Sequence, residues 1–206
     1  MTKANAKSLI RRREKIKIDR DKEYIVLEGS GRSRTTVTFD AHDSTADSST
    51  FAVHADNFVA KDITFKNSHS RSDDQAVAFR TSGDKHAYFS CGFEGYQDTL
   101  WDDKGRHYFG SCYIEGAVDF IWGDGQSIYE NCDINIVGRG YITAQGRNTE
   151  DDPSGFVFKD CEISGTGHGF LGRAYRPYSR VIFIDSKFSD VIDPLGWFVW
   201  RQHGHE

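Results

Sequence analysis

Residues 88–136 contain one short pattern three times, as YFSCGFEG at 88–95, FGSCYIEG at 109–116 and YENCDINI at 129–136. Each copy has an aromatic residue three positions before a Cys and a hydrophobic residue two positions after it. Further copies are FKDCEISG at 158–165, FIDSKFSD at 183–190 and FVAKDITF at 58–65. Repeats spaced by 20 to 30 residues are too short for propeller blades and too strand-like for helical arrays. They predict the coils of a right-handed parallel β-helix.

The composition agrees with one all-β domain. Of the 206 residues, 37% are hydrophobic and 14% aromatic, which is enough to enclose a core. Ile and Val, with 15 and 11 copies, far outnumber the 5 Leu, and such β-branched residues favour strands. We predict a basic, solvated tail at residues 1–12 and a β-helix domain at 13–206.

The charge and hydropathy pattern excludes several classes of partner. Nine Lys or Arg lie in residues 1–22, and the rest of the chain is acidic, so we predict no nucleic-acid partner. No segment approaches about 18 uncharged apolar residues, and the N-terminus is charged. We therefore expect no membrane span and no signal peptide.

The four cysteines follow the repeat. Residues at one repeat position stack in successive coils, so Cys91, Cys112, Cys132 and Cys161 are expected to be buried in the interior. A disulfide between Cys91 and Cys112 is sterically allowed, and the sequence leaves their redox state open. Because no C-x-x-C pair occurs and the interior cysteines have no histidines near them in the sequence, we expect no zinc site. We expect no other metal either.

Two aspartates occupy the same position in adjacent copies. Asp98 lies seven residues after Cys91, and Asp119 lies seven residues after Cys112. In adjacent coils they would stack at about the 4.8 Å strand spacing. Acids held this close favour one protonated and one ionised carboxyl, which suits catalysis, although a solvated acidic ridge is the alternative.

The chain resembles the plant pectin methylesterases, carbohydrate esterases built on a right-handed parallel β-helix. The matching motifs keep the family's order over residues 13–200: REKIKI, YIVLEG, TFAVHADNFVAKDITFKN, QAVAFR, YQDTL, GAVDFIWG, ITAQGR, FLGRAY and GWFVW. The resemblance implies a single-stranded, pectin-lyase-like solenoid that hydrolyses methyl esters of homogalacturonan (pectin) and releases methanol. It implies no cofactor.

The resemblance also assigns roles, position by position. Asp119 becomes the nucleophile that forms an acyl-enzyme, Asp98 the general acid and then base, and Arg173 the partner of Asp119. Gln75 and Gln97 become the oxyanion donors. The implied substrate contacts are Thr45, Gln75, Arg173, Tyr175 and Trp197.

Three departures from the family pattern lead to an expectation about activity. Tyr175 stands where the family usually has Trp, which reduces the stacking platform. The family's N-terminal strands and capping helix have no counterpart in residues 1–12, and its strands beyond GWFVW have none in RQHGHE. We therefore expect a solenoid without the family's C-terminal end, and esterase activity that is detectable but reduced.

Two alternatives to the esterase function stay open, and the family also implies a cellular location and a protein partner. Paired carboxyls also suit a retaining glycosidase, and SDD at 72–74 with GHG at 167–169 superficially resemble polygalacturonase motifs, while a lyase would need a calcium site. The other alternative is an impaired relative that only binds pectin. The family implies an extracellular location in the plant cell wall and a proteinaceous pectinesterase inhibitor as a partner.

Overall fold

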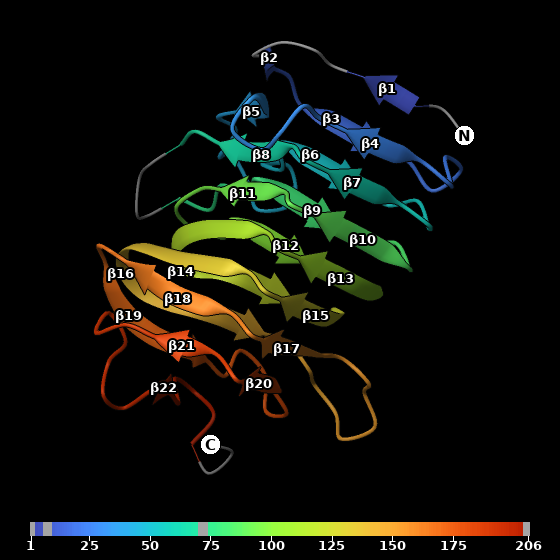
Figure 1. Ribbon diagram of the computed structural model, residues 1–206. Coiled ribbons are helices and arrows are strands. Elements are labelled where there is room, and N and C mark those ends of the chain that lie inside the picture. The colour runs from blue at the N-terminus through green and yellow to red at the C-terminus, as the bar shows by residue number, and fades with distance from the viewer. Residues whose placement is uncertain (1–2, 6–9, 70–73, 204–206) are drawn as a thin grey trace.

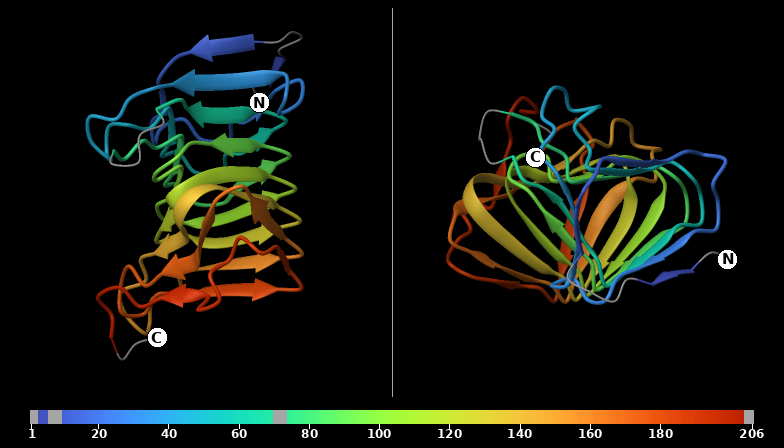
Figure 2. Two further views of the ribbon diagram at one scale, coloured as in Figure 1. Left: turned by 90° about the vertical axis from the view of Figure 1, so that its left-hand side faces the viewer. Right: turned by 90° about the horizontal axis from the view of Figure 1, so that it is seen from above.

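The computed structural model describes residues 3–5, 10–69 and 74–203. Its strands stack coil upon coil, from the N-terminal coil at the top of Figure 1 to the C-terminal coil at the bottom. The recorded strand pairs are parallel throughout these ranges, and Figure 2 (right) shows the coils superposed along the solenoid axis. The predicted parallel β-helix is confirmed.

The strands form three columns, and each column takes one segment from each coil. The first column is an eight-stranded sheet of β1 (Lys3–Asn5), β4 (Val26–Glu28), β7 (Val59–Lys61), β10 (His86–Phe89), β13 (Arg106–Gly110), β15 (Gln126–Glu130), β17 (Gly155–Lys159) and β20 (Val181–Ile184). The second contains β2 (Ile10–Arg13), β5 (Thr35–Phe39), β8 (Thr64–Asn67), β11 (Gly92–Glu94), β18 (Glu162–Gly165) and β21 (Lys187–Phe188). The third contains β3 (Ile16–Ile18), β6 (Phe51–Val53), β9 (Phe79–Thr81), β12 (Leu100–Asp102), β19 (His168–Arg173) and β22 (Trp197–Phe198). Two long strands, β14 (Tyr113–Gly123) and β16 (Asp133–Gln145), run through the second and third columns and join them into one sheet.

A left-handed residue turns the chain from the first column into the second. Ser90, Ser111, Asn131 and Asp160 have φ angles of 50° to 53° and come directly before the four cysteines. Asn and Asp tolerate this backbone better than most residues, because a short polar side chain bonds locally. The repeated polar residue is therefore a corner, and the Cys after it points inward.

The interior is filled by ladders of like residues. The rings of Tyr88, Phe109, Tyr129, Phe158 and Phe183 stack in that order, with centroids 4.5 to 4.7 Å apart. The four cysteines are also buried, and all are free. The predicted interior position of the cysteines is confirmed, because the repeat places each residue over its counterpart in the next coil.

The structure corrects the register of the repeat copy at 58–65. In the predicted alignment, Lys61 takes the position that Cys91 has in the next copy. Phe89 pairs with Lys61 and Gly92 pairs with Thr64, so Ile63 rather than Lys61 lies opposite Cys91. The error is a slip of two residues. Because side chains alternate with a period of two along a strand, this slip preserves the hydrophobic alternation and the pattern could not reveal it.

The N-terminal segment differs from the predicted tail. The backbone of β1 pairs with β4, and that of β2 pairs with β5, so parts of residues 1–12 belong to the solenoid sheets. Parallel pairing uses backbone N–H and C=O groups, which basic side chains leave available. A basic composition therefore did not exclude a strand.

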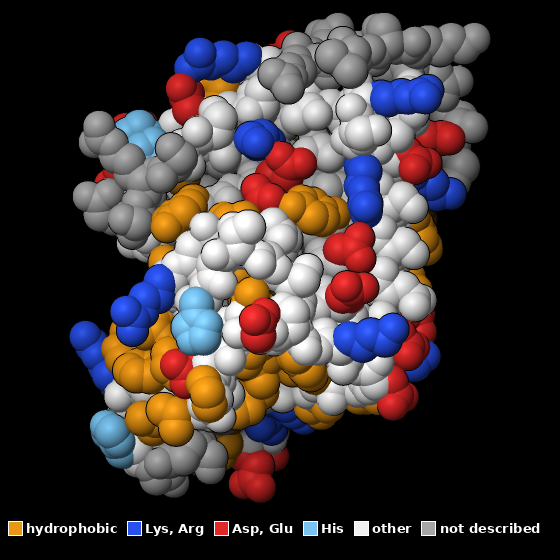
Figure 3. Space-filling view, turned by 60° about the vertical axis from the view of Figure 1, so that its left-hand side comes forward, with side chains coloured by type: hydrophobic (Ala, Val, Ile, Leu, Met, Phe, Trp, Pro, Cys, Tyr) orange, Lys and Arg blue, Asp and Glu red, His pale blue; other side chains and the backbone are white. Residues whose placement is uncertain are grey.

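The surface is mixed in character. Charged side chains of both signs are scattered over the face shown in Figure 3, and hydrophobic side chains gather over the C-terminal coils at its lower end. Exposed hydrophobic residues of these coils include Phe188, Leu195 and Trp197. Within the described ranges, no helix has the length and apolar character needed to cross a membrane.

Candidate active site

A groove of about 460 Å³ lies against the outer side of the third column. Seven of the eight predicted site residues line it: Thr45, Gln75, Gln97, Asp98, Asp119, Arg173 and Tyr175. The other lining residues are Ala46, Trp101, Trp122, Ala144 and Trp200. The structure therefore gathers into one place residues that span more than half of the chain.

The two aspartates occupy matching turns of adjacent coils. Gln97 forms a parallel bridge with Val118, and the backbone N–H of Asp98 donates to the carbonyl of Val118 at 2.9 Å. Asp98 and Asp119 have φ angles of 60° and 48°, a left-handed conformation that Asp adopts more readily than most residues. Both are more than nine-tenths buried. The predicted stacking of Asp98 and Asp119 is confirmed.

Arg173 pairs with one of these two carboxyls. Arg173 is the last residue of β19, and its Nε donates to Oδ1 of Asp119 at 2.8 Å while its Nη2 donates to Oδ2. In the described part of the chain, no cation forms an ion pair with Asp98. The ring of Trp200 lies 3.6 Å from the guanidinium carbon of Arg173 and helps to hold it. The predicted contact of Arg173 with Asp119 rather than Asp98 is confirmed.

Burial and neighbouring charges act differently on the pKa values of the two carboxyls. Burial raises the pKa of Asp98 to about 8, and the neighbouring charge of Asp119 adds to this effect. Burial also raises the pKa of Asp119, but the hydrogen bonds and the charge of Arg173 oppose the rise. The arrangement therefore favours a proton on Asp98 and a negative charge on Asp119, since only Asp119 has a bound cation.

The two glutamines present unused amides. Gln75 is exposed and Gln97 is half-buried, and both line the groove rather than the core. No hydrogen bond of either side-chain amide to another described residue is recorded. These amides are therefore free to donate to a group bound in the groove.

Aromatic rings form the floor beside the acids. Trp101 and Trp122 stack with centroids 4.4 Å apart, and Nε1 of Trp122 donates to the carbonyl of Asp98 at 3.2 Å. The ring of Tyr175 lies 5.8 Å from that of Trp200 and is 39% exposed. Such rings give a sugar an apolar surface to lie against.

One predicted substrate contact, Trp197, does not line the groove. Trp197 pairs with Gly172 and continues the inward-facing register of Leu100 and Ile121, so it does not line the groove. Trp200 lines the groove instead. Trp197 takes the inward-facing register in the last coil, where its ring centroid lies 6.1 Å from that of Phe183 and the side chain stays 46% exposed. GWFVW contains both rings, and the sequence alone does not show which one lines the groove.

The motifs that suggested a glycosidase do not meet in the groove. Ser72 and Asp73 lie outside the described residues, and Asp74 pairs with His69 at 2.9 Å. His168 lies 3.8 Å from Asp193, and neither Asp74 nor His168 lines the groove. Within the described residues, these motifs add nothing to the acid pair.

Comparison with known proteins gives a consistent result. Residues 9–205 match the family model described as Pectinesterase. "Probable pectinesterase 55" and "Probable pectinesterase 29" of Arabidopsis thaliana are each 51% identical over 94% of this chain. Those alignments cover 64% and 63% of the two relatives, so the chain spans less than two thirds of their length.

Solved structures agree on the fold. The pectin methylesterase from carrot superposes with a TM-score of 0.92 and 32% identity, over 97% of this chain and 67% of that protein. The pectin methylesterase from Aspergillus niger gives a TM-score of 0.88 at 32% identity, over 95% and 70%. The coil architecture is thus shared across distant sources.

Proposed function

The chain belongs to the pectinesterase family, and on that premise we propose that it hydrolyses the methyl esters of homogalacturonan and releases methanol. The observation that carries the proposal is the unequal acid pair. Asp119 is bound by Arg173, while Asp98 in the next coil has a pKa of about 8 and no paired cation among the described residues. An acyl-transfer reaction through a carboxylate requires one ionised acid as the nucleophile and one protonated acid as the proton donor.

The first step forms an acyl-enzyme. The ionised carboxylate of Asp119 attacks the C6 carbonyl of a methyl-esterified galacturonate, and the carbonyl electrons move to the oxygen. The amides of Gln75 and Gln97 donate to this oxyanion. When the tetrahedral intermediate collapses, the C–O bond to the methoxy group breaks, and Asp98 supplies the proton that makes methanol the leaving group.

The second step restores the enzyme. Asp98, now ionised, takes a proton from water, and the resulting hydroxide attacks the acyl carbon. The bond to Asp119 breaks, and a free galacturonate carboxyl group leaves the site. Arg173 stabilises the returning charge on Asp119 through its two hydrogen bonds.

The rest of the groove suits a polysaccharide chain. The part-buried rings of Trp101 and Trp122 and the exposed ring of Tyr175 line the groove together with the reacting acids and give it apolar surface. Pectin is accordingly the proposed substrate. A location in the plant cell wall and binding of a proteinaceous inhibitor are further proposals that follow from family membership alone.

The decisive experiment measures methanol release from methyl-esterified homogalacturonan by the purified chain. We expect release by the wild type and a loss of more than about 1000-fold in Asp119→Ala, because the nucleophile is absent. Asp103→Asn is the matched control, since Asp103 also pairs with an arginine, Arg80, at 2.8 Å but does not line the groove. It should keep near-wild-type activity.

The same assay separates the alternatives. Circular dichroism of each sample establishes that the protein is folded. Release that persists in Asp119→Ala would remove this residue from the mechanism. A folded wild type that binds pectin without releasing methanol would favour a binding protein, and new reducing ends without methanol would favour a glycosidase.

A further inference from the structure

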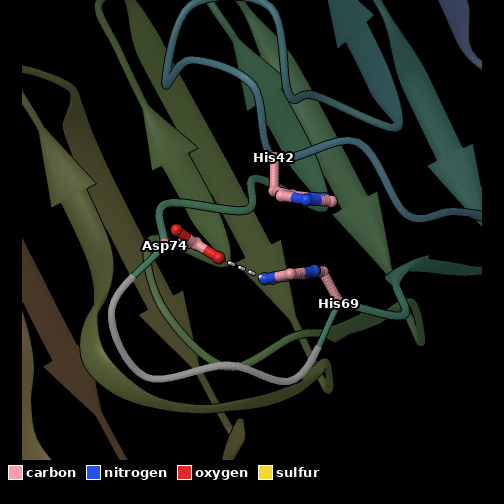
Figure 4. Close-up of side chains that lie close together, drawn as sticks. All are labelled: His42, His69 and Asp74. Carbon is pink, nitrogen blue, oxygen red and sulfur yellow. Dashed lines mark hydrogen bonds and ion pairs between the residues drawn. The ribbon is translucent and has the colours of Figure 1, made fainter.

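Two histidines and an aspartate from adjacent coils meet in one cluster (Figure 4). His42 lies in the loop between β5 and β6, and His69 and Asp74 lie in the equivalent loop of the next coil, between β8 and β9. The two imidazole rings stack with centroids 3.8 Å apart. One ligand atom from each of the three side chains lies within 4.8 Å of the others.

A buried side chain fixes the backbone beneath this cluster. Asn67 is 2% exposed, and its Nδ2 donates to the carbonyl of Ala41, the neighbour of His42, at 2.9 Å. Its Oδ1 accepts from the backbone N–H of His69 at 3.0 Å. One buried amide therefore positions both histidines, and the cluster does not depend on chance approach of two free loops.

The hydrogen bonds of the imidazoles define which atoms are available. Nδ1 of His42 lies 2.8 Å from the carbonyl oxygen of Asp40, and a carbonyl can only accept, so this nitrogen carries the proton. Nε2 of His42 then has a free lone pair. A ligating histidine usually donates its other N–H to a carbonyl in this way.

The second histidine already shares a proton with an acid. Nε2 of His69 lies 2.9 Å from Oδ2 of Asp74. A metal ion that replaced this proton would be bound by both atoms. Tetrahedral ligands at about 2.1 Å from zinc stand about 3.4 Å apart. An imidazole nitrogen binds a metal in the plane of its ring, so binding one ion requires side-chain rotations that open the stack of the two rings, which lie 16° from parallel. His42 is exposed and Asp74 is part-exposed, which leaves room for them.

We propose that His42, His69 and Asp74 form a binding site for a divalent transition-metal ion that links the two loops. Two imidazole nitrogens and one carboxylate oxygen suit zinc, whereas calcium prefers a shell of oxygens. The expectation of no metal rested on the cysteine spacing. The histidines are 27 residues apart in the sequence, and only coil stacking brings them together.

The position of this site connects it to the substrate groove. Asp74 is followed directly by Gln75, and His42 precedes Thr45 by three residues in one loop; Gln75 and Thr45 both line the groove. A bound ion would therefore restrain two groove residues through their neighbours. The binding of the ion does not depend on the proposed esterase reaction.

Isothermal titration of zinc chloride into the chelator-treated chain tests the site. We expect one site at this cluster, and an affinity at least about tenfold weaker in His42→Ala and in Asp74→Asn. His168→Ala is the matched control, because His168 also lies beside a carboxylate, Asp193, but in the described part of the chain it is not grouped with two further side chains that could hold a metal ion. Its affinity should equal that of the wild type.

A second control concerns the terminal residues His203 and His205, which form a His-x-His pair in the sequence. The double variant His203→Ala/His205→Ala should retain the zinc affinity, and calcium chloride should not compete. Zinc should also raise the thermal unfolding midpoint of the wild type but not of folded His42→Ala. Equal zinc affinity in the wild type, His42→Ala and Asp74→Asn, or loss of binding only in the terminal variant, would overturn the proposal.

Discussion

Asp98 and Asp102 are four residues apart and both are buried, yet they lie on opposite sides of the same coil wall. Asp98 faces the groove, where no cation among the described residues pairs with it, and its pKa is raised to about 8 by burial and by the charge of Asp119. Asp102 faces the interior, where His107 and Tyr129 surround it. Because both carboxyls are buried, the difference between them shows what their hydrogen-bond and ion-pair partners contribute.

Each oxygen of the interior carboxylate, that of Asp102, accepts a hydrogen bond from a side chain. Nδ1 of His107 lies 2.5 Å from Oδ1 of Asp102, and the hydroxyl of Tyr129 donates to Oδ2 at 2.7 Å. Nε2 of His107 lies 2.8 Å from the carbonyl of Gly83, so both ring nitrogens face acceptors. Burial opposes a charge on His107, but the charge and hydrogen bond of Asp102 outweigh it and raise the pKa of His107.

Partners, rather than burial, therefore decide what each acid can do. Each carboxylate oxygen of Asp102 accepts one hydrogen bond, and Asp102 forms a buried ion pair with His107 of the next coil. Asp98 has no ion-pair partner among the described residues, and its carboxyl can hold and release a proton at the surface of the groove. The same residue type thus stabilises the interior and provides reactivity outside.

The largest effect is expected from removing the interior acid. Asp102→Ala should lower the free energy of unfolding by about 3 to 5 kcal/mol, because it leaves a buried imidazolium and a buried hydroxyl without their acceptor. Asp98→Asn should leave stability unchanged or increase it, since none of the cations in the described ranges is paired with Asp98 and would lose its partner. Urea unfolding of both variants measures the difference. Equal destabilisation would show that burial alone sets the importance of these acids.

The next effect tests the groove side alone. Gln97→Ala should lower kcat about 100-fold, roughly 2.7 kcal/mol, without changing the unfolding midpoint, because it removes one proposed oxyanion donor. Gln126→Ala, an exposed glutamine of the first column, is the control and should leave kcat unchanged. Steady-state kinetics on esterified pectin give the comparison. A wild-type kcat in Gln97→Ala would remove this amide from the mechanism.

A pH series sharpens the contrast between the two acids. Asp98 must be protonated to release methanol, so kcat/KM should fall above about pH 8. A raised carboxyl pKa means that the folded state binds more protons than the unfolded state at intermediate pH, so stability decreases as pH rises toward 8. Relative to Asp98→Asn, the wild type should lose at least about 1 kcal/mol between about pH 5 and pH 8.

The titration of His107 does not affect the difference in stability between the wild type and Asp98→Asn. Its raised pKa also makes stability decrease as pH rises through the folded-state value, but this contribution is common to wild type and Asp98→Asn and cancels in the difference. If the two proteins show parallel pH–stability curves, Asp98 does not hold the extra proton.

The smallest effect concerns the two tryptophans of GWFVW. Trp200→Ala should raise KM about fivefold, because it removes the ring that lies 3.6 Å from the guanidinium carbon of Arg173. Trp197→Ala should leave KM unchanged and lower stability, since Trp197 belongs to the inward-facing register. Kinetics and thermal unfolding of the two variants test this assignment. The reverse pattern would restore Trp197 as the substrate contact.

The repeat pattern was enough to predict the coil stacking and the place of the acid pair. Equal spacing from Cys91 to Asp98 and from Cys112 to Asp119 was sufficient, because each coil repeats the same corner and strand geometry and places like positions over one another. The resemblance to pectin methylesterases then supplied the contact of Arg173, which no local pattern contains.

Other features depend on how the coils are wound, and no sequence pattern predicted them. The register of Trp197, the meeting of His42 with His69, and the enclosure of Asp102 by Tyr129 depend on how successive coils align after loops and bulges of unequal length. A strand pattern records only that side chains alternate, with a period of two. Which side faces a neighbouring coil, a loop or solvent is set by contacts between residues 25 or more positions apart, and those contacts exist only once the solenoid is wound.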